Sequence, residues 1–280
     1  MIRRLSFCFY ALISLGTALT VILTGSGEFP QLLHYLTREN GPVESSSVVV
    51  LLLTAGYAAS TLYKQKDRTA APVELRGVLV LVGLAASIAA LEEISWGQQM
   101  LGFRSSRFFL EHNLQRETNL HNLIPASISS AIINTTIYIG FIWLPCAIAL
   151  APQSSLARLV NASILQPILP STRTMMIFTF GSTLQAYFLV PTWSDTAALV
   201  GTLLLLAMAL HRDARSLPAD KFHFAWICIC TLIFVAHHDI FRFANMQYEI
   251  RELVVVLGCL HWLTDWPENL QPLANIDTAA

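Results

Sequence analysis

Two adjacent carboxylates, Glu92 and Glu93, close a long apolar stretch in the sequence LEEISWGQQMLGF. Two carboxylates near a medium of low dielectric repel each other, so such a pair can share a proton, bind a cation or act as acid and base. If the helix continues through this motif, Trp96 and Gln99 share a face with Glu92, because residues four and seven apart lie on one side of a helix. The alternative is a solvated acidic helix end with Trp96 in the interfacial aromatic belt.

A second polar motif, EHNLQRETNLHNL, begins at Glu111. In a helix, Asn113, Glu117 and His121 are successively four residues apart and line one face. A Glu and a His at this spacing can reach one metal ion, so Glu117 and His121 are candidate ligands of a divalent metal. His112 lies about 140° from Glu117 at 3.6 residues per turn, so it joins that ion only if the helix bends. The alternative is an amphipathic helix in the membrane interface.

A third polar motif, AHHDIFRFANMQYEIRE, links two apolar stretches and ends at Glu252. Its consecutive histidines, His237 and His238, are further candidate metal ligands, because neutral imidazole is a common ligand. The same segment contains four more site candidates, Asp239, Arg242, Glu249 and Glu252. The alternative interpretation is an ordinary polar turn with salt bridges.

The composition requires these motifs to be positioned by membrane helices. Hydrophobic residues make up 54% of the 280-residue chain and charged residues 12%, and the mean hydropathy is +0.56. A soluble domain carries about 25% charged residues. The net charge of −1 gives no indication of a nucleic-acid partner. The five cysteines lie in apolar stretches without a CxxC pair, so we expect buried thiols rather than disulfides or a cysteine metal site.

We expect an all-α fold, a polytopic transmembrane helix bundle of about eight spans that forms a single domain over residues 1–280. A helix crosses the hydrocarbon core with about 20 apolar residues, and seven or nine spans are alternatives. Between the third and fourth spans, residues 92–125 are expected to form an interfacial or re-entrant helical segment. The expected spans are Leu5–Leu23, Ser47–Tyr63, Val73–Leu91, Ser127–Leu150, Thr174–Val190, Thr196–His211, Phe222–Phe241 and Ile250–Trp266.

The distribution of basic residues predicts the orientation. Eleven of the 17 Lys and Arg residues fall on one side of the expected bundle and six on the other. Because cytoplasmic loops carry the excess of Lys and Arg, both termini are placed in the cytoplasm. All three polar motifs then lie at the outer face of the membrane. Ionisable groups are costly in hydrocarbon, so a cluster of them at one face indicates a site.

The strings EEISWGQ and NLQRETNLHN resemble those of a group of uncharacterised bacterial multi-pass membrane proteins. This resemblance covers residues 91–123 and implies a bacterial inner (plasma) membrane location, but no activity. The Glu pair also looks distantly like that of CAAX-type intramembrane proteases. The sequence departs from that pattern, since Gly97 stands where an arginine is expected and His112 follows too soon. His261 and Asp265, which would complete the pattern, are placed at the opposite face.

Three functions are consistent with the motifs. The favoured hypothesis is an enzyme in the lipid bilayer that catalyses metal-assisted hydrolysis or group transfer on a lipid-linked substrate. Glu92 or Glu93 would act as the base. The second is a proton-coupled small-molecule transporter, which needs a polar path to the inner side. The third is a non-catalytic assembly or scaffold subunit, in which the polar residues remain dispersed.

The orientation can be tested with reporter fusions. We expect a reporter fused after Gln115 to behave as periplasmic and one fused after Asp67 to behave as cytoplasmic, because the segment KQKDRTAAPVELR is the strongest basic signal. The reverse pattern would place the three polar motifs in the cytoplasm.

Overall fold

The computed structural model describes residues 1–25, 35–38, 41–65, 73–163, 165–186, 193–212, 217–237 and 246–276. Within these residues the secondary structure is helical and contains no strand. The long helices are α1 (Ile2–Gly25), α3 (Pro42–Gln65), α4 (Val73–Glu93), α11 (Thr172–Ala186), α12 (Trp193–Arg212), α13 (Pro218–Ala236) and α14 (Met246–Ile276), together with the continuous series α7 (Ala126–Thr135), η3 (Thr136–Trp143) and α8 (Leu144–Leu150). The expected all-α class is therefore confirmed.

Five helical stretches of the described chain are long and apolar enough to cross a membrane. They are Ile2–Leu23, Pro42–Gln65, Leu75–Glu93, Ile128–Leu150 and Pro218–Ala236, and Ala197–Arg212 is a shorter apolar helix. Large apolar side chains such as Leu12, Leu81 and Leu204 are exposed on the outside of these helices, as expected for contact with lipid. The chain is thus a multi-pass membrane protein, while a count of about eight spans is not confirmed.

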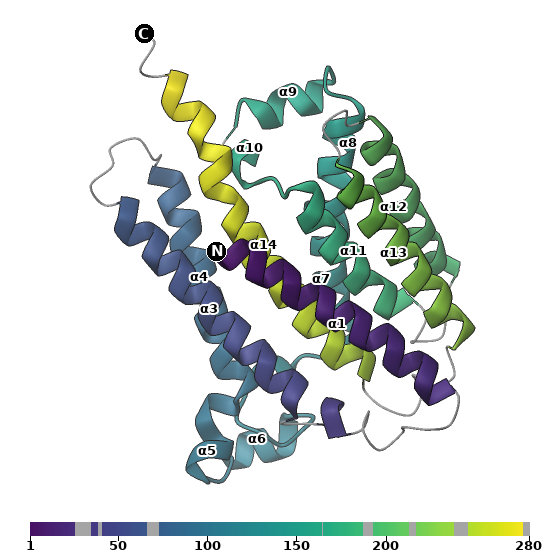
Figure 1. The fold of residues 1–280 in the computed structure, drawn as a ribbon. Coiled ribbons are helices and arrows are strands. Elements are labelled where there is room, and N and C mark those ends of the chain that lie inside the picture. Colours follow the sequence, from purple (N-terminus) through teal and green to yellow (C-terminus); the bar gives the residue numbers. More distant parts are fainter. Residues whose placement is uncertain are drawn as a thin grey trace.

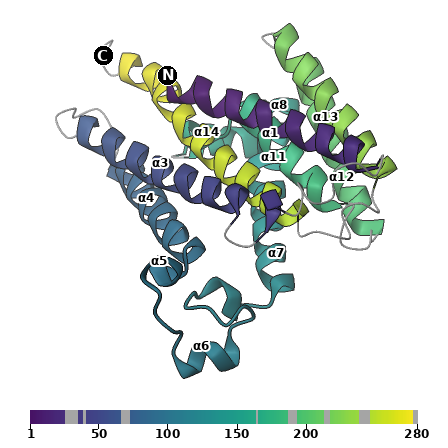
Figure 2. The same cartoon turned by 60° about the horizontal axis from the view of Figure 1, so that its bottom comes forward.

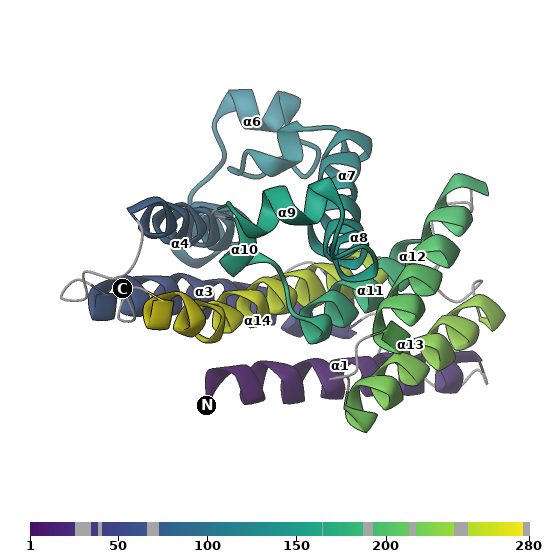
Figure 3. The same cartoon turned by 90° about the horizontal axis from the view of Figure 1, so that it is seen from above.

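Helix α14 occupies the middle of the bundle and packs against α1, α3 and α11. Figure 3 shows α1 and α13 on one side of the layer formed by α3 and α14, with α4 and α7 beyond it on the other side. The core between α11 and α14 is close-packed, with Phe178, Val254 and Leu257 almost fully buried. This arrangement brings together the starts of α3 and α14 and the end of α4, which face the same end of the molecule (Figures 1 and 2).

A buried polar network joins α1, α11 and α14 at the other end of the bundle. Asp265 is only 2% exposed, and its carboxylate lies 3.1 Å from the guanidinium of Arg3 and accepts a 2.7 Å hydrogen bond from Thr174. The His261 ring lies 3.0 Å from the Ser6 hydroxyl. The start of α1 therefore lies beside the second half of α14 and the start of α11. His261 and Asp265, which the sequence placed at the face opposite the polar motifs, thus connect α14 to α1 and α11.

Local sequence explains two irregular helical stretches. The wide π-helical turns of η3 directly precede Pro145, whose ring would clash with the carbonyl of Phe141 in a regular α-helix. Helix α9 (Ser155–Asn161) begins where the Ser154 hydroxyl accepts a 3.1 Å hydrogen bond from the Ala157 amide. Helix α10 (Leu165–Ile168) then leads into α11.

The contact between α11 and α14 requires a glycine at position 258. A Cβ atom on Gly258 would lie 2.9 Å from the Phe178 ring, which is itself buried against Phe141. We expect Gly258→Ala to lower the free energy of unfolding by about 1–3 kcal/mol through overpacking, measured as a lower thermal midpoint in detergent. Gly201→Ala is the matched control, because no atom lies within 4 Å of its added Cβ. An unchanged midpoint for Gly258→Ala would contradict this packing.

Candidate functional site

Helix α4 ends in a left-handed turn, so the expected continuation of the helix through Trp96 is wrong. Ser95, Trp96 and Gly97 have positive φ angles of 47°, 55° and 80°, a conformation that only glycine adopts readily. Residues 95–97 form the 3-10 turn η1, and α5 (Gln98–Leu101) follows in a new direction. Gln99 lies in α5, but its side chain is outside the described residues. Two strained non-glycine residues in succession need compensating interactions.

The carboxylate of Glu92 supplies these interactions. One oxygen accepts a 2.6 Å hydrogen bond from the Trp96 indole, and the other accepts bonds of 2.5 and 3.0 Å from the amides of Leu120 and His121. The His121 ring nitrogen also lies 3.5 Å from this carboxylate. Glu92 is 7% exposed, and hydrogen bonds to an ionised group are the strong ones. Glu92 therefore attaches the distant segment at residue 120 to the end of α4.

The segment after α6 (Arg107–His112) is a turn and not the helix that the four-residue spacing predicted. The Asn113 side-chain oxygen accepts hydrogen bonds from the amides of Gln115 and Glu117, and its nitrogen donates to Asn119. Asparagine competes for backbone groups in this way and so favours turns. Arg116 has a φ of 59°. The next helical turn is η2 (His121–Leu123).

Asn113, Glu117 and His121 consequently do not line one helical face, so the helical spacing that suggested a metal site at Glu117 and His121 is absent. Glu117 accepts a short hydrogen bond from the Ser95 hydroxyl and a 3.5 Å bond from the Asn119 amide. The Glu117 carboxylate is thereby tied to the turn that ends α4. His112 is exposed at the end of α6, where its ring stacks on Phe108 with the centroids 4.8 Å apart.

Further polar residues of this segment, which the sequence did not single out, complete the same network. The Gln98 side-chain oxygen accepts a 2.8 Å hydrogen bond from the Thr118 amide, and the Ser105 hydroxyl donates to the Arg116 carbonyl at 2.8 Å. Asn119 is almost fully buried and donates to the Ser95 hydroxyl at 3.1 Å. The only sequence signal for these roles is the density of Asn, Gln, Ser and Thr in residues 95–122. We call residues 95–123, with this network, the polar cap.

Glu93 has different surroundings from Glu92. Together with Glu44 of α3 it lines a cavity of about 130 Å³, to which Ser45, Val48 and Ile94 also contribute. Glu252, near the start of α14, lies within electrostatic range of both Glu93 and Glu44. No hydrogen bond engages the Glu93 carboxylate among the described residues. The site thus contains three carboxylates from three helices, of which α3 packs against both α4 and α14, and Glu44 was not among the sequence candidates.

Arg251 supplies a cation near these carboxylates. It is buried, it lies within electrostatic range of Glu252, and its guanidinium donates a 2.6 Å hydrogen bond to the Asn134 side chain. This hydrogen bond connects the start of α14 to α7, so the guanidinium of Arg251 points toward α7. Glu249, one turn before Glu252, is half-buried.

Two of the three polar motifs meet at the end of α4, and of the third motif only its last part, at Glu252, comes near them in the described residues. Glu92 lies beside His121, and Glu117 accepts a hydrogen bond from Ser95 in the turn that follows α4. His237 follows α13, which packs against α1, α11 and α12 and lies across α14 from α4 (Figures 1 and 3). His238, Asp239 and Arg242 fall outside the described residues, so their proposed roles remain predictions.

Within the described ranges, no group of three His, Cys, Asp or Glu side chains is arranged to hold a metal ion. Comparisons with protein-family models, curated protein sequences and solved structures find no match for this chain. The assignment of a function therefore depends on the geometry of the polar cap and of the three carboxylates.

The different roles of the paired carboxylates can be measured. We expect Glu92→Gln to raise the hydrogen-exchange rates of the Leu120 and His121 amides by about tenfold or more, because the substitution removes charge-assisted bonds worth about 1.5–3 kcal/mol. Glu93→Gln should leave exchange in the polar cap unchanged, since Glu93 faces the cavity. Equal effects of the two substitutions in hydrogen-exchange mass spectrometry would show that Glu92 does not anchor the cap.

Proposed function

We propose that this protein is a membrane enzyme that uses Glu93 as a general base and acid in hydrolysis or group transfer on a lipid-linked substrate. The observation that carries the proposal is the division of roles between two neighbouring carboxylates. Glu92 is saturated with hydrogen bonds from the polar cap, whereas Glu93 lines a cavity with Glu44. Placing a carboxylate at the end of a membrane helix costs free energy, so the position of Glu93 in a cavity favours a functional role.

The neighbouring carboxylates make proton transfer at this position reasonable. Glu44, Glu93 and Glu252 lie within electrostatic range of one another, and like charges in such a cluster favour the uptake of a proton or a cation. Glu93 would take a proton from water or from an attacking hydroxyl group, and would return it to the leaving group when the bond to that group breaks. The proposal routes no step through a metal ion, since the carboxylates of Glu92 and Glu117 are engaged by the cap.

The membrane context supports a lipid-linked substrate. The cavity lies between the start of α3 and the end of α4, two helices that are apolar and long enough to cross a bilayer. A substrate with a lipid anchor would reach this depth by diffusing in the membrane plane. With both termini in the cytoplasm, as the basic residues predict, the cavity would face the outer side of a bacterial inner membrane.

A proton-coupled carrier receives less support from the same geometry. Such a carrier needs a polar path from the three carboxylates to the buried network of Arg3 and Asp265 at the other end. Residues 253–260 of α14 separate the two groups over roughly 12 Å, and they contain no ionisable side chain other than Cys259. A scaffold function would leave the carboxylate cluster without an assigned role.

The proposal predicts the behaviour of Glu93→Gln. Purified protein in vesicles of a bacterial lipid extract should convert a lipid component, followed by mass spectrometry, and Glu93→Gln should slow this conversion by about 10²-fold or more while the protein remains folded. Glu111→Gln is the matched control, because Glu111 is exposed and pairs only with the surface residue Arg107 in the described structure. Full conversion by the Glu93→Gln/Glu44→Gln double variant would refute the enzymatic proposal and favour a scaffold.

A further inference from the structure

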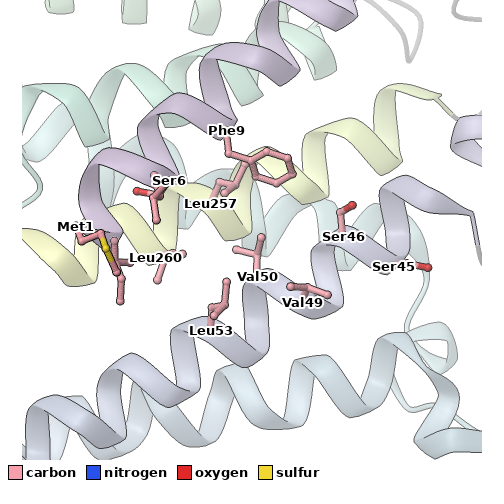
Figure 4. A pocket seen from close by; sticks show the side chains of 12 residues that line it. Met1, Ser6, Phe9, Ser45, Ser46, Val49, Val50, Leu53, Leu257 and Leu260 are labelled. Atoms are coloured by element: carbon pink, nitrogen blue, oxygen red, sulfur yellow. The ribbon is translucent and has the colours of Figure 1, made fainter.

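An apolar groove of about 650 Å³ runs between α1 and α3, with α14 as its floor (Figure 4). Its walls are formed mainly by Leu5, Phe9, Val49, Leu53, Leu257 and Leu260. Both wall helices are apolar and long enough to span a membrane, so the groove runs along two membrane-spanning segments. An occupant that reaches it from the bilayer has to be largely apolar.

Two of the serines that line the groove donate their hydroxyl protons within their own helices. The Ser46 hydroxyl donates a 2.7 Å bond to the carbonyl of Pro42, and the Ser6 hydroxyl donates a 3.0 Å bond to the carbonyl of Arg3. Both serines thus use their protons within their own helices. The middle of the groove is suited to a hydrocarbon chain and offers little to a peptide backbone, which would need partners for its polar groups.

The groove and the carboxylate cavity adjoin at Ser45. Ser45 lines both, and it lies next to Glu44 at the start of α3. Figure 4 shows Ser45 and Ser46 at one end of the groove and Met1 and Leu53 toward the other. From Ser45 to Leu53 the groove follows α3 for roughly 12 Å. A molecule in it would therefore have an apolar part along α1 and α3 and a polar end beside Glu44 and Glu93.

We infer that the groove holds one acyl chain of a membrane lipid whose headgroup carries an ammonium group, with this ammonium in the cavity beside Glu44 and Glu93. The inference rests on the proposed function, since it names the class of lipid that the site takes. Charge complementarity selects the headgroup. Glu44 and Glu93 line this end and Glu252 lies within electrostatic range of both, while the nearby Arg251 guanidinium is bonded to Asn134. A purely anionic headgroup would be repelled.

The arrangement also matches the way a lipid lies in a bilayer. The carboxylates are at the ends of their helices and the groove extends from them toward the middle of α3. A lipid headgroup lies at the membrane surface and its chains point toward the midplane, so a lipid can enter from the side without inverting. Binding of the chain would fix the headgroup next to the cavity, and such positioning is a large part of catalysis.

Photocrosslinking tests the inference without requiring turnover. The probe is phosphatidylethanolamine with a diazirine in one acyl chain, incorporated in vesicles that contain the full-length protein. We expect crosslinks on the groove-lining residues of α1 and α3. Val49→Trp should reduce them by about tenfold by filling the groove. Leu52→Trp is the matched control, because Leu52 and Val49 are both 56% exposed on α3 and only Val49 lines the groove.

The headgroup is tested with phosphatidylglycerol that carries the same diazirine chain. This probe should label the groove about tenfold less than the amine-bearing probe, because it lacks one charge-assisted contact with the carboxylates. Glu44→Gln should reduce this difference. Equal labelling by the two probes would overturn the ammonium assignment. Labelling spread evenly over all lipid-facing helices, or crosslinks between two copies of the chain through α1 and α3, would overturn the lipid groove itself.

The outcomes separate this inference from the proposed function. Groove labelling that is lost in Val49→Trp, in a protein whose Glu93→Gln variant converts lipid normally, would support the lipid site and refute the enzymatic role. Conversely, conversion that depends on Glu93 but is unchanged in Val49→Trp would support the enzyme and refute the groove as its substrate site.

Discussion

The hydrogen-bonded carboxylate of Glu92 is the interaction on which the arrangement of this site depends. It lies in the last turn of α4, where the chain leaves the apolar part of the bundle, and it accepts three N–H donors from Trp96, Leu120 and His121. Placing polar groups near hydrocarbon costs free energy unless these groups form hydrogen bonds. By satisfying these donors, one side chain closes the polar cap over the end of the helix and makes the left-handed turn at residues 95–97 tolerable.

The anchoring of Glu92 also determines what Glu93 can do. Successive helix positions are about 100° apart at 3.6 residues per turn, so when Glu92 faces the cap, Glu93 faces α3. There it meets Glu44, and the groove between α1 and α3 begins one residue further along at Ser45. The pair EE thus has one member that anchors the polar cap and one that lines the cavity. At the opposite end, Arg3, Asp265 and Thr174 form a network in which the buried carboxylate is balanced by a cation and a hydroxyl.

The sequence predicted those features that depend on local pattern. Apolar length located the long helices, for example α13 at Pro218–Ala236 against an expected Phe222–Phe241. It did not predict the break at residues 95–97, because helical periodicity extends through Trp96 and only Gly97 indicates otherwise. It also mistook the four-residue spacing of Asn113 and Glu117 for a helix, although the Asn113 side chain binds the Glu117 amide and makes a turn. The proximity of Glu44 to Glu93 is a contact between different helices, which no local pattern reveals.

The division of roles between Glu92 and Glu93 is most directly tested by chemical labelling with a hydrophobic carbodiimide, which enters membranes and attaches covalently to protonated carboxyl groups. Fragmentation of the labelled peptide by mass spectrometry distinguishes the two adjacent residues. The account predicts modification at Glu93, which lines the cavity, and little at Glu92, whose two oxygens are occupied by the cap. Modification of Glu92 at the same rate as Glu93, or faster, would contradict it.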